Sequence, residues 1–371
     1  MPKAKLTWII DAIDPNLYAP FEVDKDTDYY LDLRDRYKKL LNSAKNAGAD
    51  DESIEIITKF KERILLALRD FYKGNEVPAH QRIKNLVKDC IGDSFAVTTV
   101  NYSPAFPGTA GSELQLFRGR LGNPRGYEAK EMLHLPYSKR GLTGNYRFSI
   151  PGVPSLYLGN SSYACWMELD RPSETHFNVS PVLLDGSQRI LNLAVMNRDF
   201  LKLNDCDADC VHSWLRLMML MIATSYRIKE TGRIFKSEYI ISQSIMLACK
   251  QLGLDGIAYY SRKVTDQVFA RATVNLALFT VYKFGQEYSD VCKHIKIGDA
   301  FNYQLFKELG VANTDASYDL RTTEAGAMTV LGNYDRRFEY GLTDFCAFDR
   351  FLFKGWNHSK VAWGNALVDK R

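Results

Sequence analysis

Apolar residues recur at helical spacing between Thr27 and Ile91, as in YYLDLRDRYKKLLNSA and ESIEIITKFKERILLALRDFY. Residues three and four positions apart lie on one face of a helix, so this spacing predicts amphipathic helices. Asp and Ser stand at plausible helix starts and Gly at plausible stops. The pattern therefore predicts a helical N-terminal region with two long helices and a shorter third.

Short strands and helices follow in an irregular order. The segment NYSPAFPGTAGS is rich in Pro, Gly and Ser and precedes the strand-like ELQLFRGRL, which places a domain boundary at residue 112. Strand patterns such as SLYLGN and DGIAYYS then mix with helical ones without regular βαβ alternation, which predicts an α+β fold. We expect three parts: a helical domain (1–112), an α+β catalytic domain (113–283) and a C-terminal extension without a clear period (284–371).

Composition narrows the classes of partner and compartment. Lys and Arg number 48 against 44 Asp and Glu, a surplus too small to favour nucleic acid or a polybasic membrane anchor. The seven cysteines are scattered and odd in number, unlike a disulfide framework. We therefore expect a cytoplasmic protein that binds neither nucleic acid nor membrane.

Two further segments invite functional readings that we set aside. The apolar run from Trp214 to Tyr226 is far shorter than the roughly 20 residues of a membrane span and carries Arg216, so it predicts a buried helix. Cys206, Cys210 and His212 lack the paired spacing of a zinc site, so we expect no metal.

Four motifs occur in an order that is characteristic of one family. They are LFRGR (116–120), HLPYSKRGLTGNYRFSIPGVPSLYLGNSS (134–162), ACWMEL (164–169) and LGLDGIAYYSRK (252–263). Residues 113–283 thereby resemble the RES domain, a family of NAD-consuming enzymes that includes toxins of toxin–antitoxin pairs. The resemblance implies a fold like that of ADP-ribosyltransferases, and attack by phosphate or water on the anomeric carbon of the ribose.

The resemblance also assigns residues. It gives Arg118, Glu168 and Ser261 as the catalytic set, and Arg120 is an alternative to Arg118. The family's second arginine and its strand tyrosine are matched by two further residues, Arg147 and Tyr157.

The chemistry of NAD⁺ cleavage explains these residue types. Nicotinamide leaves as a neutral group, so the main demand is to stabilise an oxocarbenium-like ribose, which the Glu168 carboxylate can do. Guanidinium groups grip a diphosphate bidentately, which suits Arg118, Arg147 and Arg140. Aromatic rings can pack against the nicotinamide and enclose it.

For that last role the candidates are Tyr157 and Tyr146, and the Ser261 hydroxyl is expected to orient the substrate or the nucleophile. Simpler readings exist: Glu168 as a solvated helix residue, the arginines as partners in structural ion pairs, Tyr157 as core filling and Ser261 as a turn residue.

We expect from this an enzyme that degrades NAD⁺ by phosphorolysis or hydrolysis and acts as a toxin or defence effector. NAD⁺ is then a substrate, phosphate a candidate co-substrate, and no cofactor is needed. Restraint by an antitoxin-like protein, by the flanking domains or by a trigger is expected, and a homo-oligomer stays open. Two alternatives remain: an ADP-ribosyltransferase acting on a macromolecule, and a non-catalytic NAD-binding module.

Overall fold

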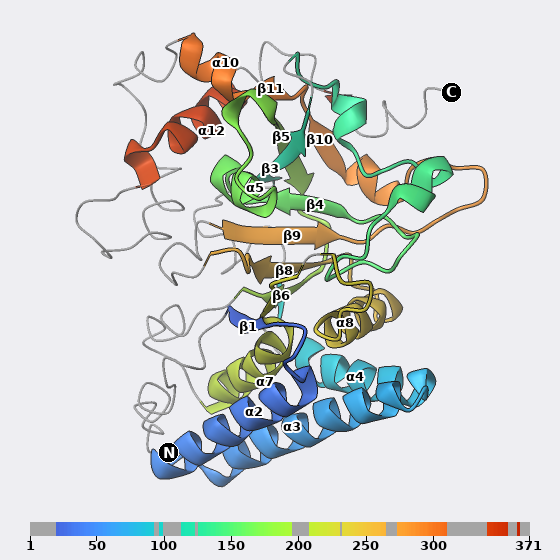
Figure 1. The fold of residues 1–371 in the computed structure, drawn as a ribbon, viewed down its shortest axis with the longest axis vertical. Helices are drawn as coiled ribbons and strands as arrows, with labels where there is room; N and C mark the ends of the chain where they lie inside the picture. Colours follow the sequence, from blue (N-terminus) through green and yellow to red (C-terminus); the bar gives the residue numbers. More distant parts are fainter. Residues whose placement is uncertain are drawn as a thin grey trace. The chain divides into compact units, whose positions relative to one another are not determined.

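The chain forms two compact units in the computed structural model (Figure 1), which describes residues 20–92, 96–98, 113–122, 125–194, 208–230, 232–264, 273–309, 340–354 and 362–363. The helical unit comprises Met1–Thr98 and Ile190–Leu254, and the sheet unit comprises Thr99–Arg189 and Asp255–Arg371. Residues 190–254 therefore belong with the N-terminal helices, although the sequence placed them within residues 113–283.

Three helices open the helical unit: α2 (Tyr29–Asn46), α3 (Asp51–Tyr72) and α4 (Glu76–Ile91). Asp28 and Asp50 cap the first two, because their side chains accept hydrogen bonds from main-chain N–H groups of the first turn. Two long helices and a shorter third were predicted, and this is confirmed.

The apolar run after Ala208 forms a buried helix of the same unit. Helix α7 (Ala208–Thr224) carries the hydrogen-bond acceptors for two buried tyrosines of α2. The Tyr29 hydroxyl donates to the Ala223 carbonyl oxygen and the Tyr37 hydroxyl to that of Met219, each at 2.7 Å. Helix α8 (Tyr239–Gln251) packs against α4. Two short strand pairs complete the unit. Strand β1 (Phe21–Val23) pairs with β7 (Tyr226–Ile228), and β2 (Val97–Thr98) pairs with β6 (Ile190–Leu193).

The sheet unit is built on antiparallel strands in the order β12-β10-β5-β3-β4-β9-β8. Their bounds are β3 (Glu113–Leu121), β4 (Leu156–Gly159), β5 (Phe177–Asp185), β8 (Gly256–Tyr260), β9 (Val274–Leu278), β10 (Ile295–Ile297) and β12 (Ala362–Trp363), and β11 (Phe301–Asn302) also pairs with β5. The chain thus combines a helical N-terminal region with an antiparallel sheet joined by irregular connections, which confirms the predicted α+β class.

Short helices fill the connections of this unit. They are η2 (Ala129–Met132), η3 (Tyr137–Leu142), α5 (Ser162–Glu168), η4 (Glu174–His176), η6 (Asp290–His294), α10 (Tyr303–Glu308), η8 (Tyr340–Leu342) and α12 (Asp344–Lys354). Within the described part of the chain, no helix is both long and apolar enough to cross a bilayer.

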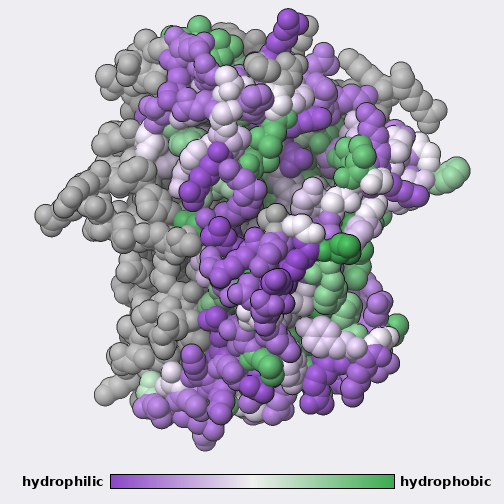
Figure 2. Space-filling view, in the orientation of Figure 1, coloured by the Kyte–Doolittle hydropathy of each residue, from purple (hydrophilic) through white to green (hydrophobic). Residues whose placement is uncertain are grey.

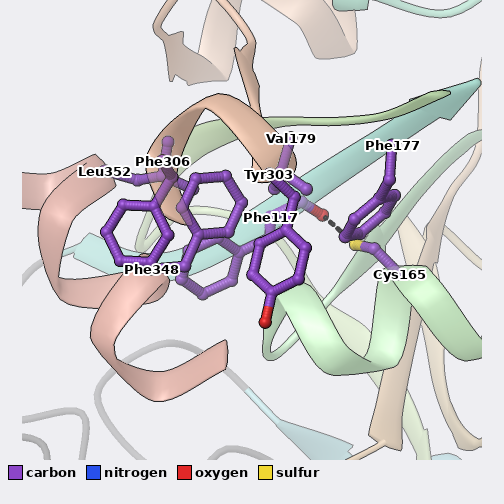
Figure 3. Packing of buried hydrophobic residues seen from close by; sticks show 8 residues of the cluster. All are labelled: Phe117, Cys165, Phe177, Val179, Tyr303, Phe306, Phe348 and Leu352. Atoms are coloured by element: carbon purple, nitrogen blue, oxygen red, sulfur yellow. Dashed lines mark hydrogen bonds between the residues drawn. The ribbon is translucent and has the colours of Figure 1, made fainter. Parts of the chain in front are cut away.

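An aromatic cluster joins the last part of the chain to the sheet. Figure 3 shows α10 and α12 supplying rings that pack against β3, β5 and α5, in the cluster Phe117, Cys165, Phe177, Val179, Tyr303, Phe306, Phe348 and Leu352. Strands β10 and β11 pair directly with β5. The boundary expected at residue 283 thus falls inside the sheet unit, and the last part of the chain completes its core.

Among the residues coloured in Figure 2, hydrophilic side chains predominate, and the apolar ones gather in several separate patches. Two almost fully exposed apolar residues, Ile234 and Phe284, lie in different units. Scattered residues of this kind are normal on globular proteins and indicate no docking surface by themselves.

Candidate active site

Helix α5 brings Glu168 close to the sheet because glycines lie beneath it. A Cβ atom at Gly119 of β3 would lie 2.8 Å from the Cβ of Cys165, and one at Gly159 of β4 would lie 3.0 Å from the Cβ of Ala164. Only glycine allows this approach without displacing the helix. The Ser161 side chain caps α5 by accepting from the Ala164 N–H, and the helix ends at Glu168.

The Glu168 carboxylate is held against strand β9. Its Oε1 atom accepts a hydrogen bond from Nδ2 of Asn275 at 2.6 Å, and Asn275 is itself buried. Glu168 is partly buried, so it is not the fully solvated helix residue of the simpler reading. Asn275 was missed at the sequence level, where its only signal is a single amide in the apolar strand VNLAL.

The turn after α5 is tied to the turn after β8. Nζ of Lys263 donates to the main-chain oxygen of Glu168 at 2.8 Å and to Oδ1 of Asp170 at 2.6 Å. Asp170 and Arg171 both have positive φ angles, 63° and 55°, which are uncommon outside glycine. Strain of this kind immediately after Glu168 is typical of functional sites.

Ser261 lies in the same turn as Lys263. Its hydroxyl oxygen accepts from the Lys263 N–H at 3.2 Å, and its own N–H donates to the Thr273 carbonyl oxygen at 2.8 Å. The side chain is buried. Ser261 therefore does shape a turn, as the simpler reading held, and Lys263 connects that turn to Glu168.

Arg118 reaches the neighbouring strand. Strands β3 and β4 pair at a single position, Phe117 with Gly159, and beside it Nη1 of Arg118 donates to the Tyr157 carbonyl oxygen at 2.7 Å. Burial lowers the pKa of the Arg118 guanidinium, and the nearby charge of Arg120 adds to that shift.

The alternative arginine, Arg120, points to a different place. Its Nη1 atom donates to the Glu131 carbonyl oxygen at 2.6 Å, and its guanidinium carbon lies 4.3 Å from the centre of the Tyr127 ring. Of the two arginines, Arg118 is the one in contact with β4.

Arg147 lies over the ring of Tyr259, with its guanidinium carbon 5.1 Å from the ring centre. Its Nε and Nη1 atoms are buried and lack a hydrogen-bond partner in the described structure. Sequence reasoning missed a second such residue, Arg262, which directly follows Ser261 and is only 4% exposed. Burial lowers the Arg262 pKa well below its usual value, and the neighbouring Arg147 charge adds to the effect.

The tyrosines expected to hold nicotinamide contact each other. The rings of Tyr146 and Tyr157 meet edge to face with their centres 5.9 Å apart. Tyr146 is exposed and Tyr157 is partly buried. Arg140 lies apart on η3, where its guanidinium carbon is 5.5 Å from the ring centre of Tyr282.

Apart from Arg140, the predicted residues fall into two sets of contacts. Glu168 lies with Arg147 and Arg262, whose charges interact, and Lys263 connects it to the Ser261 turn. Arg118 lies with Tyr157 and Tyr146. No hydrogen bond or ion pair joins Arg118 to Glu168 among the described residues.

Among the described residues, no cluster of three His, Cys, Asp or Glu side chains is arranged to hold a metal ion. His212, considered above for zinc, instead lies 3.2 Å from Asp50 and 3.3 Å from Glu52, whereas Cys206 lies outside the described residues.

Comparison with known proteins gives one sequence relative and no family model. The chain is 34% identical to the protein named "Putative toxin YopC" of Bacillus subtilis (strain 168) over an aligned stretch of 173 residues. That stretch covers 41% of this chain and 37% of YopC, so the match spans little more than a third of the relative. A search of family models found no match.

A solved structure gives a weaker likeness. A chain of the structure described as "Crystal structure of the M.tuberculosis MbcT-MbcA toxin-antitoxin complex" aligns with 52% of this chain and 80% of its own length. The sequence identity is 13% and the TM-score is 0.27, which is too low to carry an argument about shared fold.

Proposed function

We propose that this protein cleaves the bond between nicotinamide and ribose in NAD⁺. The observation that carries the proposal is the Glu168 carboxylate, which Asn275 holds close to the guanidinium groups of Arg262 and Arg147. Two nitrogen atoms of each guanidinium are buried and have no hydrogen-bond partner among the described residues. NAD⁺ has the complementary charges, since its ribose becomes cationic during cleavage while its diphosphate is anionic. The family resemblance of the sequence motifs supports the same reaction.

The reaction needs no general acid to protonate the leaving group. The bond from ribose C1′ to the ring nitrogen breaks, and both electrons stay with nicotinamide, which leaves neutral. Glu168 stabilises the positive charge that develops on the ribose. Water or phosphate then bonds to C1′; water loses a proton to solvent, and phosphate adds as an anion. Arg118, Arg147 and the two tyrosines orient the substrate.

The biological role that we propose is that of a toxin or defence effector. It rests on the similarity to a relative whose name describes it as a toxin. An antitoxin-like protein is the proposed partner, because unrestrained NAD⁺ loss would harm the producing cell. Cys90, Cys165, Cys249, Cys292 and Cys346 are buried and form no disulfide, which supports a reducing compartment such as the cytoplasm.

Nicotinamide release by the purified protein tests this function. We expect release from NAD⁺ by the parent and a loss of at least about a hundredfold in Glu168→Gln, since a preorganised charge is removed. Glu308→Gln, at an exposed position on α10, is the matched control and should keep full activity. Running the assay with and without phosphate identifies the nucleophile.

Two results would contradict the proposal. Equal release by the parent and Glu168→Gln would remove Glu168 from the reaction. Labelled ADP-ribose appearing on protein or nucleic acid would instead support transfer to a macromolecule, and NAD⁺ binding without any nicotinamide release would support a non-catalytic module.

A further inference from the structure

Arg262 is a buried charged residue that lies in the last of the four motifs but has no part in the reaction steps described above. It follows strand β8 and is 4% exposed, yet its Nε and Nη2 atoms have no hydrogen-bond partner in the described part of the chain. Buried polar atoms are nearly always paired, so each exception calls for a physical explanation.

A second guanidinium with the same property lies beside it. Nε and Nη1 of Arg147 are also buried and unpartnered within the described residues, and the Arg147 charge disfavours the charge on Arg262. Two like charges in a buried place repel each other, and each costs free energy unless an opposite charge and hydrogen bonds compensate. The Glu168 carboxylate interacts with the Arg262 charge, but it accepts its hydrogen bond from Asn275.

The unfilled donors indicate the chemistry of the missing group. Four buried nitrogen atoms on two adjacent guanidinium groups can donate hydrogen bonds to several oxygen atoms at once, and a tetrahedral phosphate group offers negatively charged oxygens as acceptors. The ring of Tyr259, next to Arg147, closes one side with an aromatic face. Lysine would give a point charge without this geometry.

We propose that Arg147 and Arg262 together form a binding site for a phosphate group next to Glu168. The proposal deepens the function proposed above and rests on it for the source of the group. That source is either the diphosphate of NAD⁺ or a free phosphate ion positioned to attack the ribose.

Ligand-induced stabilisation tests the site. The probes are inorganic phosphate and ADP-ribose, each compared with chloride at equal ionic strength, and the measurement is the midpoint of thermal unfolding together with calorimetric titration. A ligand that binds only the folded state raises this midpoint. We expect the parent to be stabilised, and affinity to fall about tenfold or more in Arg262→Met and Arg147→Met, since hydrogen bonds to a charged group are lost.

The unfolding temperature of the variants without ligand distinguishes a ligand-binding role of the arginines from a structural one. If the arginines serve to bind a ligand, Arg262→Met should unfold at the same temperature as the parent, or at a higher one, when no phosphate is present. The reason is that an uncompensated buried charge is replaced by an apolar side chain. Lys139→Met, at an exposed position on η3, is the control and should bind phosphate normally. Should Arg262→Met fail to fold, Arg262→Lys keeps the charge and should still weaken binding.

The outcomes separate the two proposals. Stabilisation by phosphate alone assigns the site to the nucleophile, and stabilisation by ADP-ribose alone assigns it to the diphosphate; both support the site. Absence of any stabilisation of the parent, or equal stabilisation of Arg262→Met or Arg262→Lys, would overturn it. The proposed function can fail while the phosphate site stands. That would be the result if the parent released no nicotinamide while Glu168→Gln still bound these anions.

Discussion

At the scale of residues, the candidate site depends on how one carboxylate is held. Glu168 is the last residue of a seven-residue helix, and its position is set by Asn275 on β9 and by Lys263 after β8. Neither partner is near Glu168 in the sequence. A hydrogen bond to a charged group is stronger than one between neutral groups, so the contact from Asn275 limits the motion of the carboxylate, while Lys263 holds the main chain of Glu168.

Asn275 should act as a positioning residue. Replacing it by alanine removes the donor to Glu168 and leaves the carboxylate free to rotate, so we expect kcat for nicotinamide release to fall about tenfold or more. KM should change little, because Asn275 is directed at Glu168 and not at the proposed phosphate site. Steady-state kinetics measures this split, and a rise in KM at constant kcat would contradict it.

The sequence located part of this site and missed part of it. Arg118, Glu168, Ser261 and Tyr157 stand in motifs whose spacing was readable. Asn275 and Arg262 were not, because an amide or an arginine beside an apolar strand has no periodic signature, and its neighbours come from distant strands. Whether the chosen residues perform catalysis stays a prediction.

At the scale of elements, helix α12 supports the helix that carries Glu168. The buried Asp349 of α12 accepts hydrogen bonds from the Ser162 N–H at 2.9 Å and from the Tyr340 hydroxyl at 2.6 Å. The first of these lies in the opening turn of α5, where an acceptor satisfies a main-chain donor. A residue close to the C-terminus thereby holds the start of the helix that ends at Glu168.

The burial of the Asp349 carboxyl should make stability depend on pH. Burial raises the pKa of Asp349 from 3.8 to about 7, so the folded state binds a proton more tightly than the unfolded one. The resulting stabilisation is complete below pH 3.8 and is lost as pH rises to about 7, with a slope of up to about 1.4 kcal/mol per pH unit.

The variant Asp349→Asn tests that dependence. It should flatten the decline in the free energy of unfolding between pH 5 and about 7, because the titrating group is gone. Urea unfolding across this pH range measures the slope. An unchanged slope in the variant would mean that another group is responsible.

At the scale of the whole molecule, the two units are discontinuous in sequence. Residues 190–254 leave the sheet unit, join the N-terminal helices and return at Asp255. The sheet unit is likewise completed by β10, β11, α10 and α12 from the last part of the chain. Residues 113–283 alone thus lack part of the core around β5 and include helices of the other unit.

Truncation after residue 283 should therefore prevent normal folding. It removes Tyr303, Phe306, Phe348 and Leu352, the rings and side chains that cover Phe117 and Phe177, and leaves one edge of β5 unpaired. We expect an aggregating or molten product with weak near-ultraviolet circular dichroism. A cooperative unfolding transition like that of the full chain would show that residues 113–283 contain a sufficient core.

The sequence by itself determined the local elements of this protein, because helix periodicity and capping act within a few residues; α2, α3 and α4 follow from them directly. It also determined the class of fold. Tertiary structure alone decided which unit each segment joins, because the apolar face of a helix such as α7 does not specify the element against which it packs. It likewise decided which charges meet: Arg262 reaches Arg147 and Glu168 only because β8, β9 and the turn after α5 converge.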